Sequence, residues 1–246
     1  AAPMVRGADG ELTETRWADA LTRAARALKS ATSSGGPGRV AVIGGSRLTN
    51  ESAYAWAKLA KGVLGTDHVD AQLADGLPAD VVLGLPKATI DEACAPGGTV
   101  LLLAPDLKEE LPVLHLRLRH AAVSDGVRII EVAPRSTGLT AHAAESLRHQ
   151  PGDAAALVRA LLAGGAAPAG VDSDALARAR DALAGDALTV VLGRASLAES
   201  AAGTVEAAAA VADARPGARF LSALRRSNVH GALDLGLAPG VLPGRV

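Results

Sequence analysis

The stretch of sequence that decides the fold is Gly44-Gly45-Ser46-Arg47-Leu48-Thr49-Asn50-Glu51-Ser52-Ala53-Tyr54. The apolar run Val40 to Ile43 precedes it and predicts a strand buried on both faces of a parallel sheet. Gly45 permits a sharp turn after that strand. Thr49 or Asn50 can cap a following helix, and Gly65 can end it in a left-handed conformation. The stretch therefore predicts a strand, a loop and a helix.

Apolar runs and helical patterns alternate along the rest of the chain. Strands are expected at Val40 to Ile43, Val81 to Leu83, Val100 to Leu103, Val127 to Val132, Leu188 to Leu192 and Ala218 to Leu221. Helices are expected at Asn50 to Leu64, Glu110 to Val123, Asp153 to Leu162, Asp174 to Leu183 and near Leu197 to Ala214. Right-handed crossovers between such strands give parallel sheets, so the sequence predicts a doubly wound α/β fold with helices on both faces.

The organisation of the chain is predicted more coarsely. Residues 4–15 suggest a hairpin around Ala8 to Gly10, a helical pattern begins at Trp17, and Ser30 to Gly38 has the composition of a loop. We expect an α/β core over residues 1–150 and a second α/β portion of the same region over residues 151–246.

Composition excludes several classes of function. The 246 residues carry 25 basic and 26 acidic side chains and only 2% aromatic residues, whereas a nucleic-acid surface needs a basic stripe and often stacking rings. No apolar run approaches the roughly 18 to 20 residues of a membrane span. The single cysteine, Cys94, cannot form a disulfide within the chain and fits a reducing compartment.

Common catalytic and nucleotide-binding motifs are absent from the sequence. Gly44-Gly45-Ser46-Arg47 lacks the Gly-x-Gly-x-x-Gly spacing of a dinucleotide site, and no phosphate loop or Gly-x-Ser-x-Gly elbow occurs. His115 and His120 lie five residues apart on one expected helix, so we predict two surface histidines and no metal pair. His142 and His149 receive no ligand role either.

The stretch 44–54 resembles the molybdopterin oxidoreductase superfamily, whose members carry an Arg-x-Thr-Asn-Glu-like turn. A second match runs from Ala133 to Ala143 and resumes at Gln150 to Leu157, where it looks like the family's Asp-Pro-Arg-x-Thr and Pro-Gly-Thr-Asp segments. The resemblance implies the α/β domains of the formate dehydrogenase and DMSO reductase type.

Within this superfamily the chain is most similar to the G subunit family of NADH-quinone oxidoreductases, in the Ala-rich form of high-GC bacteria. The supporting segments are Met4 to Leu21, Lys108 to Arg119 and Arg225 to Pro239. The resemblance starts in the middle of the family's domain, which suggests a piece of a longer polypeptide. It implies 2Fe-2S and 4Fe-4S clusters upstream of Ala1 and electron flow from NADH through FMN and clusters to quinone. It also implies other peripheral-arm subunits as partners, and a cytoplasmic place on the inner face of the membrane.

The family's redox groups are not expected in this chain. Iron–sulfur clusters need several grouped thiolates, and only Cys94 is present. Active relatives carry a Cys, selenocysteine, Ser or Asp metal ligand in a long insert after the position of Asp70, whereas here the sequence passes directly to an expected strand at Ala79 to Leu83. We therefore predict no catalytic residue, no metal and no cofactor in this chain.

The resemblance does mark positions where active relatives hold the pterin dinucleotide. These vestigial positions are Arg47, Asn50, Glu51, Arg135, Pro151, Gly152 and Asp153. Asp153 has a simpler explanation as the cap of a helix starting at Ala154. If the pocket is empty, we expect Arg135 to be bound by a carboxylate or by backbone carbonyls, because a buried guanidinium without acceptors is costly.

Two other functions remain open from the sequence. The chain could be a fragment of an active molybdopterin-dependent oxidoreductase of the formate dehydrogenase or nitrate reductase kind, which bound pterin in the purified chain would favour. It could also be a plain interaction module without redox association. Co-purification with respiratory subunits would separate that module from a structural part of the respiratory complex.

Overall fold

The computed structural model describes residues 2–71, 77–185, 187–194 and 199–244. The chain forms two compact units: unit 1 is Ala1–Leu73 with Asn228–Val246, and unit 2 is Ala74–Ser227. The chain thus begins in unit 1, builds unit 2 and returns to unit 1. The division expected at residue 150 falls inside unit 2, whose single sheet takes strands from both sides of that position.

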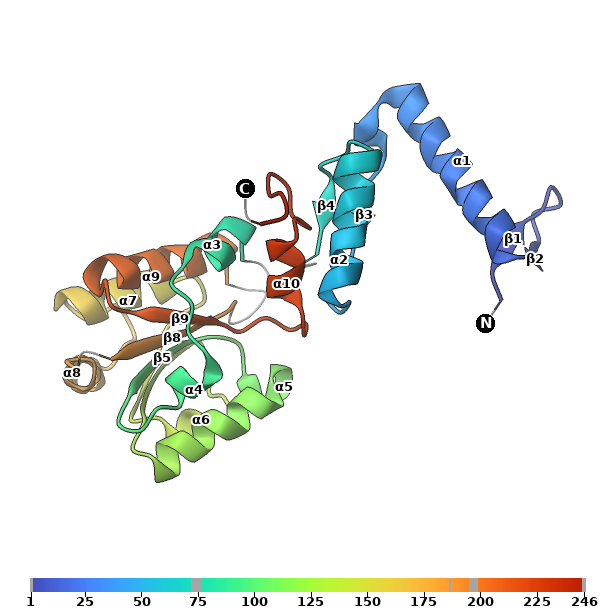
Figure 1. Ribbon diagram of the computed structural model, residues 1–246. Coiled ribbons are helices and arrows are strands. Elements are labelled where there is room, and N and C mark those ends of the chain that lie inside the picture. Colours follow the sequence, from blue (N-terminus) through green and yellow to red (C-terminus); the bar gives the residue numbers. More distant parts are fainter. Residues whose placement is uncertain (1, 72–76, 186, 195–198, 245–246) are drawn as a thin grey trace. The chain divides into compact units, whose positions relative to one another are not determined.

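Unit 2 is built on a five-stranded parallel sheet with the order β7-β6-β5-β8-β9 (Figure 1). The strands are β5 (Thr99–Leu103), β6 (Arg128–Ala133), β7 (Glu145–Arg148), β8 (Leu188–Leu192) and β9 (Arg219–Ser222). The chain winds outward from β5 to β7 and then returns to the other side of β5 for β8 and β9. This reversal is the doubly wound topology, which confirms the fold class that the sequence predicts.

Helices cover both faces of this sheet. Figure 1 shows α4 (Ile90–Ala93), α5 (Leu107–Glu110) and α6 (Pro112–Ser124) on one side, with α7 (Ala154–Ala163) and α9 (Ala201–Ala214) on the other. The unit also contains α3 (Ala79–Gly84), the 3-10 turn η3 (Thr140–His142) and α8 (Ser173–Ala182). Because both faces are covered, all five residues of β5 are buried, as its continuous apolar run predicts.

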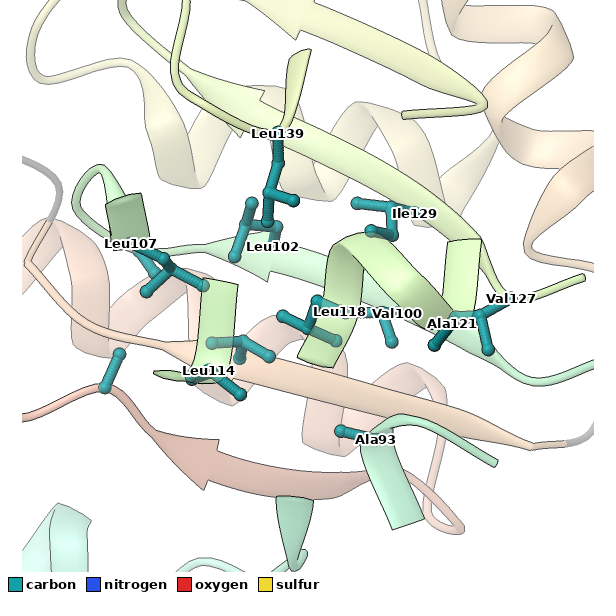
Figure 2. Close-up of a cluster of buried hydrophobic side chains, with 13 residues drawn as sticks. Ala93, Val100, Leu102, Leu107, Leu114, Leu118, Ala121, Val127, Ile129 and Leu139 are labelled. Atoms are coloured by element: carbon teal, nitrogen blue, oxygen red, sulfur yellow. The ribbon is translucent and has the colours of Figure 1, made fainter. Parts of the chain in front are cut away.

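The core between the sheet and α6 is drawn in Figure 2. Val100 and Leu102 face α6 from β5, Ile129 faces it from β6, and Leu118 is fully buried at the middle of the helix. Leu114, Leu118 and Ala121 recur at three- and four-residue spacing, which puts them on one face of the helix. This face of α6 is therefore the apolar side that packs on the sheet.

Unit 1 holds smaller elements. They are β1 (Met4–Arg6) and β2 (Leu12–Glu14) in an antiparallel hairpin, α1 (Trp17–Gly35), η1 (Pro37–Arg39), β3 (Val42–Ile43) paired in parallel with β4 (Val69–Asp70), α2 (Asn50–Ala57), η2 (Lys58–Val63) and α10 (Val229–Asp234). Ala53 and Ala57 of α2 pack with Ala71, Ala232 and Leu237. The Lys61 ammonium donates to the carbonyls of Ala238 and Val241, at 2.8 and 2.7 Å, and so holds the returning segment.

Several local predictions are wrong. The apolar run expected as a strand near Ala79 to Leu83 is helix α3, because such a short run fits either element. The strand at Val40 to Ile43 is reduced to β3, and Ile43 is 65% exposed instead of buried. Helix α1 extends to Gly35, since Thr32 and Ser34 bond back to carbonyls of the preceding turn and do not break it.

The glycine predictions are confirmed. Gly45 has φ +106°, and Gly65, after the helical segment that ends at Val63, has φ +69°. The predicted helix near Leu197 to Ala214 is α9, which begins at Ala201, and the residues expected before it at 197–198 lie outside the described residues. Residues 72–76, in the segment after Asp70 where the sequence predicts that the insert is missing, also lie outside them.

Candidate functional site

The carboxyl ends of the parallel strands of unit 2 meet at one edge of the sheet, where open α/β folds present their ligand loops. Arg135 follows β6, the turn Pro151 to Asp153 follows β7, and Gly193 follows β8. The switch in winding direction lies between β5 and β8 at this edge. Four of the positions marked by the resemblance, Arg135 and Pro151 to Asp153, therefore lie in loops at this edge.

The loop after β6 is organised by a buried carboxylate, Glu131. Its side chain is fully buried and accepts hydrogen bonds from the hydroxyls of Thr137, Thr140 (2.8 Å) and Ser146 (2.5 Å). The Arg148 guanidinium on β7 donates to the same carboxylate at 3.1 Å. Each oxygen of Glu131 thus has a donor, which is how a buried charge is tolerated.

Arg135 does not take part in this network. It is exposed, and within the described residues its guanidinium makes no hydrogen bond or ion pair. The prediction that Arg135 is bound by a nearby acceptor is therefore wrong. Arg148 does this instead, because its strand lies beside β6 and brings its side chain to Glu131.

The turn after β7 is closed by a carboxylate from far along the chain. Gly152 has φ +96°, and its backbone amide donates to both oxygens of Glu199, at 3.1 and 3.2 Å. Glu199 is only 2% exposed. Sequence reasoning missed Glu199 because no motif surrounds it and 47 residues separate it from Gly152.

His149 lies beside this carboxylate and is also buried. Its Nδ1 is 2.7 Å from the carbonyl oxygen of Gln150 and 3.8 Å from an oxygen of Glu199. The Nε2 atom is buried and has no hydrogen-bond partner among the described residues. Donation from Nδ1 to the carbonyl leaves Nε2 as an acceptor in the neutral ring.

A cavity of about 10 Å³ lies between these groups, lined by Leu103, Val132, His149, Ala154, Gly193, Glu199, Thr204 and Ala207. That volume is enough for about one water molecule. Gly193 keeps the strand ends close together, because a Cβ there would lie 2.9 Å from the Ala223 carbonyl oxygen and from Pro105. The Gly152 amide is thus bonded to Glu199, and the cavity beside it is the size of one water molecule.

Asp153 lies at the start of a helix, as expected for a helix cap. It is the N-cap residue of α7, which begins at Ala154, but its side chain forms no capping hydrogen bond. The predicted position is therefore correct, whereas the expected cap bond is not present.

The other three marked positions lie in unit 1, around the start of α2. Thr49 is the N-cap and accepts from the Ser52 amide. The hydrogen bonds of the Glu51 carboxyl to its own amide and to Thr49 lower the pKa of that carboxyl. Arg47 is exposed and makes no hydrogen bond among the described residues.

Asn50 is engaged by the returning segment of unit 1. The Asn228 amide group donates to Asn50 Oδ1 at 2.9 Å and to the Leu48 carbonyl at 2.8 Å. A Cβ at Gly231 would lie 2.2 Å from Asn50 Oδ1, so the sequence Asn228 to Gly231 suits this close approach. This hydrogen bond gives Asn50 a structural partner that sequence reasoning missed.

The described residues give no support for a metal site at the histidines. The described residues contain no group of three or more His, Cys, Asp and Glu side chains placed to hold a metal ion. His115 is 7% exposed, so its prediction as a surface residue is wrong, and burial lowers the pKa of its imidazole. His120 is exposed, as predicted.

With this geometry established, comparison with known proteins identifies the family. Residues 1–165 match the profile described as molybdopterin oxidoreductase, which covers about two thirds of the chain. The chain therefore belongs to the molybdopterin oxidoreductase family. It is 32% identical to the NADH-quinone oxidoreductase G subunit of Streptomyces coelicolor and 34% identical to that of Mycobacterium bovis, over 98% of its length in both cases.

The chain spans only 30% and 29% of those two relatives. Among solved structures, acetylene hydratase from Pelobacter acetylenicus matches 90% of this chain and 34% of its own, with a TM-score of 0.61 and 16% identity. That likeness supports the fold alone. Within the described residues, no helix is both long and apolar enough to cross a membrane.

The exposure of Arg135 leads to a prediction about stability. Arg135→Ala should change the free energy of unfolding by less than about 0.5 kcal/mol, because the side chain is exposed and unbonded among the described residues. Arg148→Ala, the matched control, should cost clearly more, since it removes a donor to buried Glu131. Urea denaturation followed by circular dichroism measures both. Equal losses would contradict the assignment of Arg148 as the bound arginine.

Proposed function

We propose that this chain is a structural, non-catalytic α/β part of the G subunit in the peripheral arm of an NADH-quinone oxidoreductase. The observation that carries the proposal is the similarity to such G subunits along 98% of the chain. In this proposal electrons pass from NADH through FMN and iron–sulfur clusters to quinone, and the 2Fe-2S and 4Fe-4S clusters lie upstream of Ala1. This chain shapes the arm and carries no electron.

The site geometry supports the structural role. We propose that Arg47, Asn50, Glu51, Arg135, Pro151, Gly152 and Asp153 are vestiges of a pterin dinucleotide site. The Glu199 carboxylate, which accepts hydrogen bonds from the Gly152 amide, would repel a phosphate at that amide. This repulsion favours the interpretation of these residues as vestiges. The partners are other peripheral-arm subunits, and the location is the cytoplasmic face of the membrane that holds the complex.

The test is purification of the native protein that contains this sequence from detergent-solubilised membranes through a C-terminal affinity tag. We expect the other NADH-quinone oxidoreductase subunits in equal amounts by mass spectrometry, NADH-dependent quinone reduction, and less than about 0.1 molybdenum per complex by elemental analysis. The tagged isolated chain, purified in parallel, should contain no stoichiometric iron, molybdenum or zinc.

The other outcomes each overturn the proposal. One molybdenum with bound pterin per polypeptide, together with formate or nitrate turnover, would identify a fragment of an active molybdopterin enzyme. A protein that purifies without respiratory subunits and without metal would be a plain interaction module.

A further inference from the structure

The outward face of α6 is apolar although it is exposed. Val113, Leu116 and Val123 are 69%, 58% and 67% exposed, while the opposite side of the helix packs on the sheet. Their spacing of three and seven residues places them in one stripe along a helix roughly 20 Å long. This spacing is that of a helix that packs against another helix. A surface hollow of about 220 Å³ lies along the stripe, lined by Leu116, Arg119, His120, Val123 and Ser124.

An arginine lies on each border of this stripe. At about 3.6 residues per turn, Arg117 falls on one side of the stripe and Arg119 on the other. Asp91 binds Arg117, whereas Arg119 makes no hydrogen bond or ion pair among the described residues. His120 lies within the stripe, with its Nε2 3.8 Å from a carboxylate oxygen of Asp125. The charge at this face that no ion pair among the described residues neutralises, that of Arg119, is therefore positive.

We propose that this face of α6 docks an amphipathic helix of a partner polypeptide whose apolar stripe is bordered by Glu or Asp. An acidic border would pair with Arg119 while the apolar side chains cover Leu116 and Val123. A second copy of this chain is a poor occupant, because pairing α6 with itself brings the Arg119 borders of the two copies, which have no acidic partner among the described residues, toward each other. The proposal rests on α6 alone and is independent of the proposed function.

The probe is a fluorescein-labelled synthetic helix three heptads long, with Leu at the a and d positions and Glu at e and g. A matched peptide carries Lys in place of Glu. Fluorescence anisotropy with the full chain should show binding of the acidic peptide only. Leu116→Ser should weaken that binding at least about tenfold. Arg119→Glu should weaken it similarly and let the Lys peptide bind, because the border charge is reversed.

The controls are Leu21→Ser and Arg23→Glu on α1, where both side chains are also exposed. These variants should bind the acidic peptide like the parent chain, and circular dichroism checks that every variant is folded. Equal binding of both peptides, or equal losses in the α1 variants, would overturn the proposal. So would a dimer in sedimentation equilibrium that Leu116→Ser dissolves, or binding to phosphatidylglycerol vesicles that the same variant abolishes.

Discussion

Replacing Glu131 by alanine is expected to lower the free energy of unfolding of unit 2 by about 3 to 5 kcal/mol. The substitution removes the acceptor shared by Thr137, Thr140, Ser146 and Arg148 and leaves their donors without it in a buried place. It should also release the loop after β6, because two of those hydroxyls belong to that loop. Urea denaturation followed by circular dichroism measures the loss, and amide exchange at residues 137–140 measures the release.

The matched control is Glu206→Ala, which breaks an ion pair with Arg159 in which both side chains are 56% exposed. That loss should be at most about 1 kcal/mol, since water screens the pair. Glu131→Gln should fall between the two, because the amide keeps one acceptor oxygen but sets an NH₂ group against donors. Similar losses in all three variants would refute the buried network as the element that holds the loop.

Replacing Gly45 by valine is expected to destabilise unit 1 by about 2 to 4 kcal/mol. Its φ of +106° strains any residue that has a Cβ, and that Cβ would lie 2.6 Å from Leu237 Cδ1. Leu237 is fully buried and cannot move away without loss of packing. Both tryptophans, Trp17 and Trp56, lie in unit 1, so tryptophan fluorescence follows its unfolding in urea.

Gly44→Val separates backbone strain from the clash. Gly44 has φ +122°, but nothing lies within 4 Å of a Cβ built there. It should cost about 1 to 3 kcal/mol from strain alone. Adding Leu237→Ala to Gly45→Val should then recover part of the larger loss by making room. No recovery in the double variant, or equal costs at both glycines, would contradict the clash with Leu237.

The long apolar strands of unit 2 can be predicted because their signal is local. β5 and β8 are predominantly apolar, with Thr189 the polar residue inside β8, and this composition is enough to indicate a strand buried on both faces. β7 escapes prediction, because Glu145 to Arg148 contains one apolar residue, Leu147, and does not stand out from a loop. The run at Ala79 to Leu83 misleads for the opposite reason, since it is apolar but too short to reveal its period.

Only part of the candidate site can be predicted from the sequence. Resemblance finds Arg135 and the turn Pro151 to Asp153, and the sheet does bring their loops to one edge. Glu131 has a local signal, as a charge within the apolar part of β6, but its donors come from a later loop and from β7. Glu199 has no such signal.

The order of residues by itself determined the α/β class, the parallel strands, the turn glycines and membership of the molybdopterin oxidoreductase family, because each depends on short spacings along the chain. Only the tertiary structure decided which polar groups meet. Glu131 is hydrogen-bonded to Arg148 and not to Arg135, and the Gly152 amide donates to Glu199. These partners are close because the sheet brings strand ends together regardless of their separation in sequence. Because the carboxylates of Glu131 and Glu199 are buried, they need these hydrogen bonds: a charge removed from water must have hydrogen-bonding partners nearby.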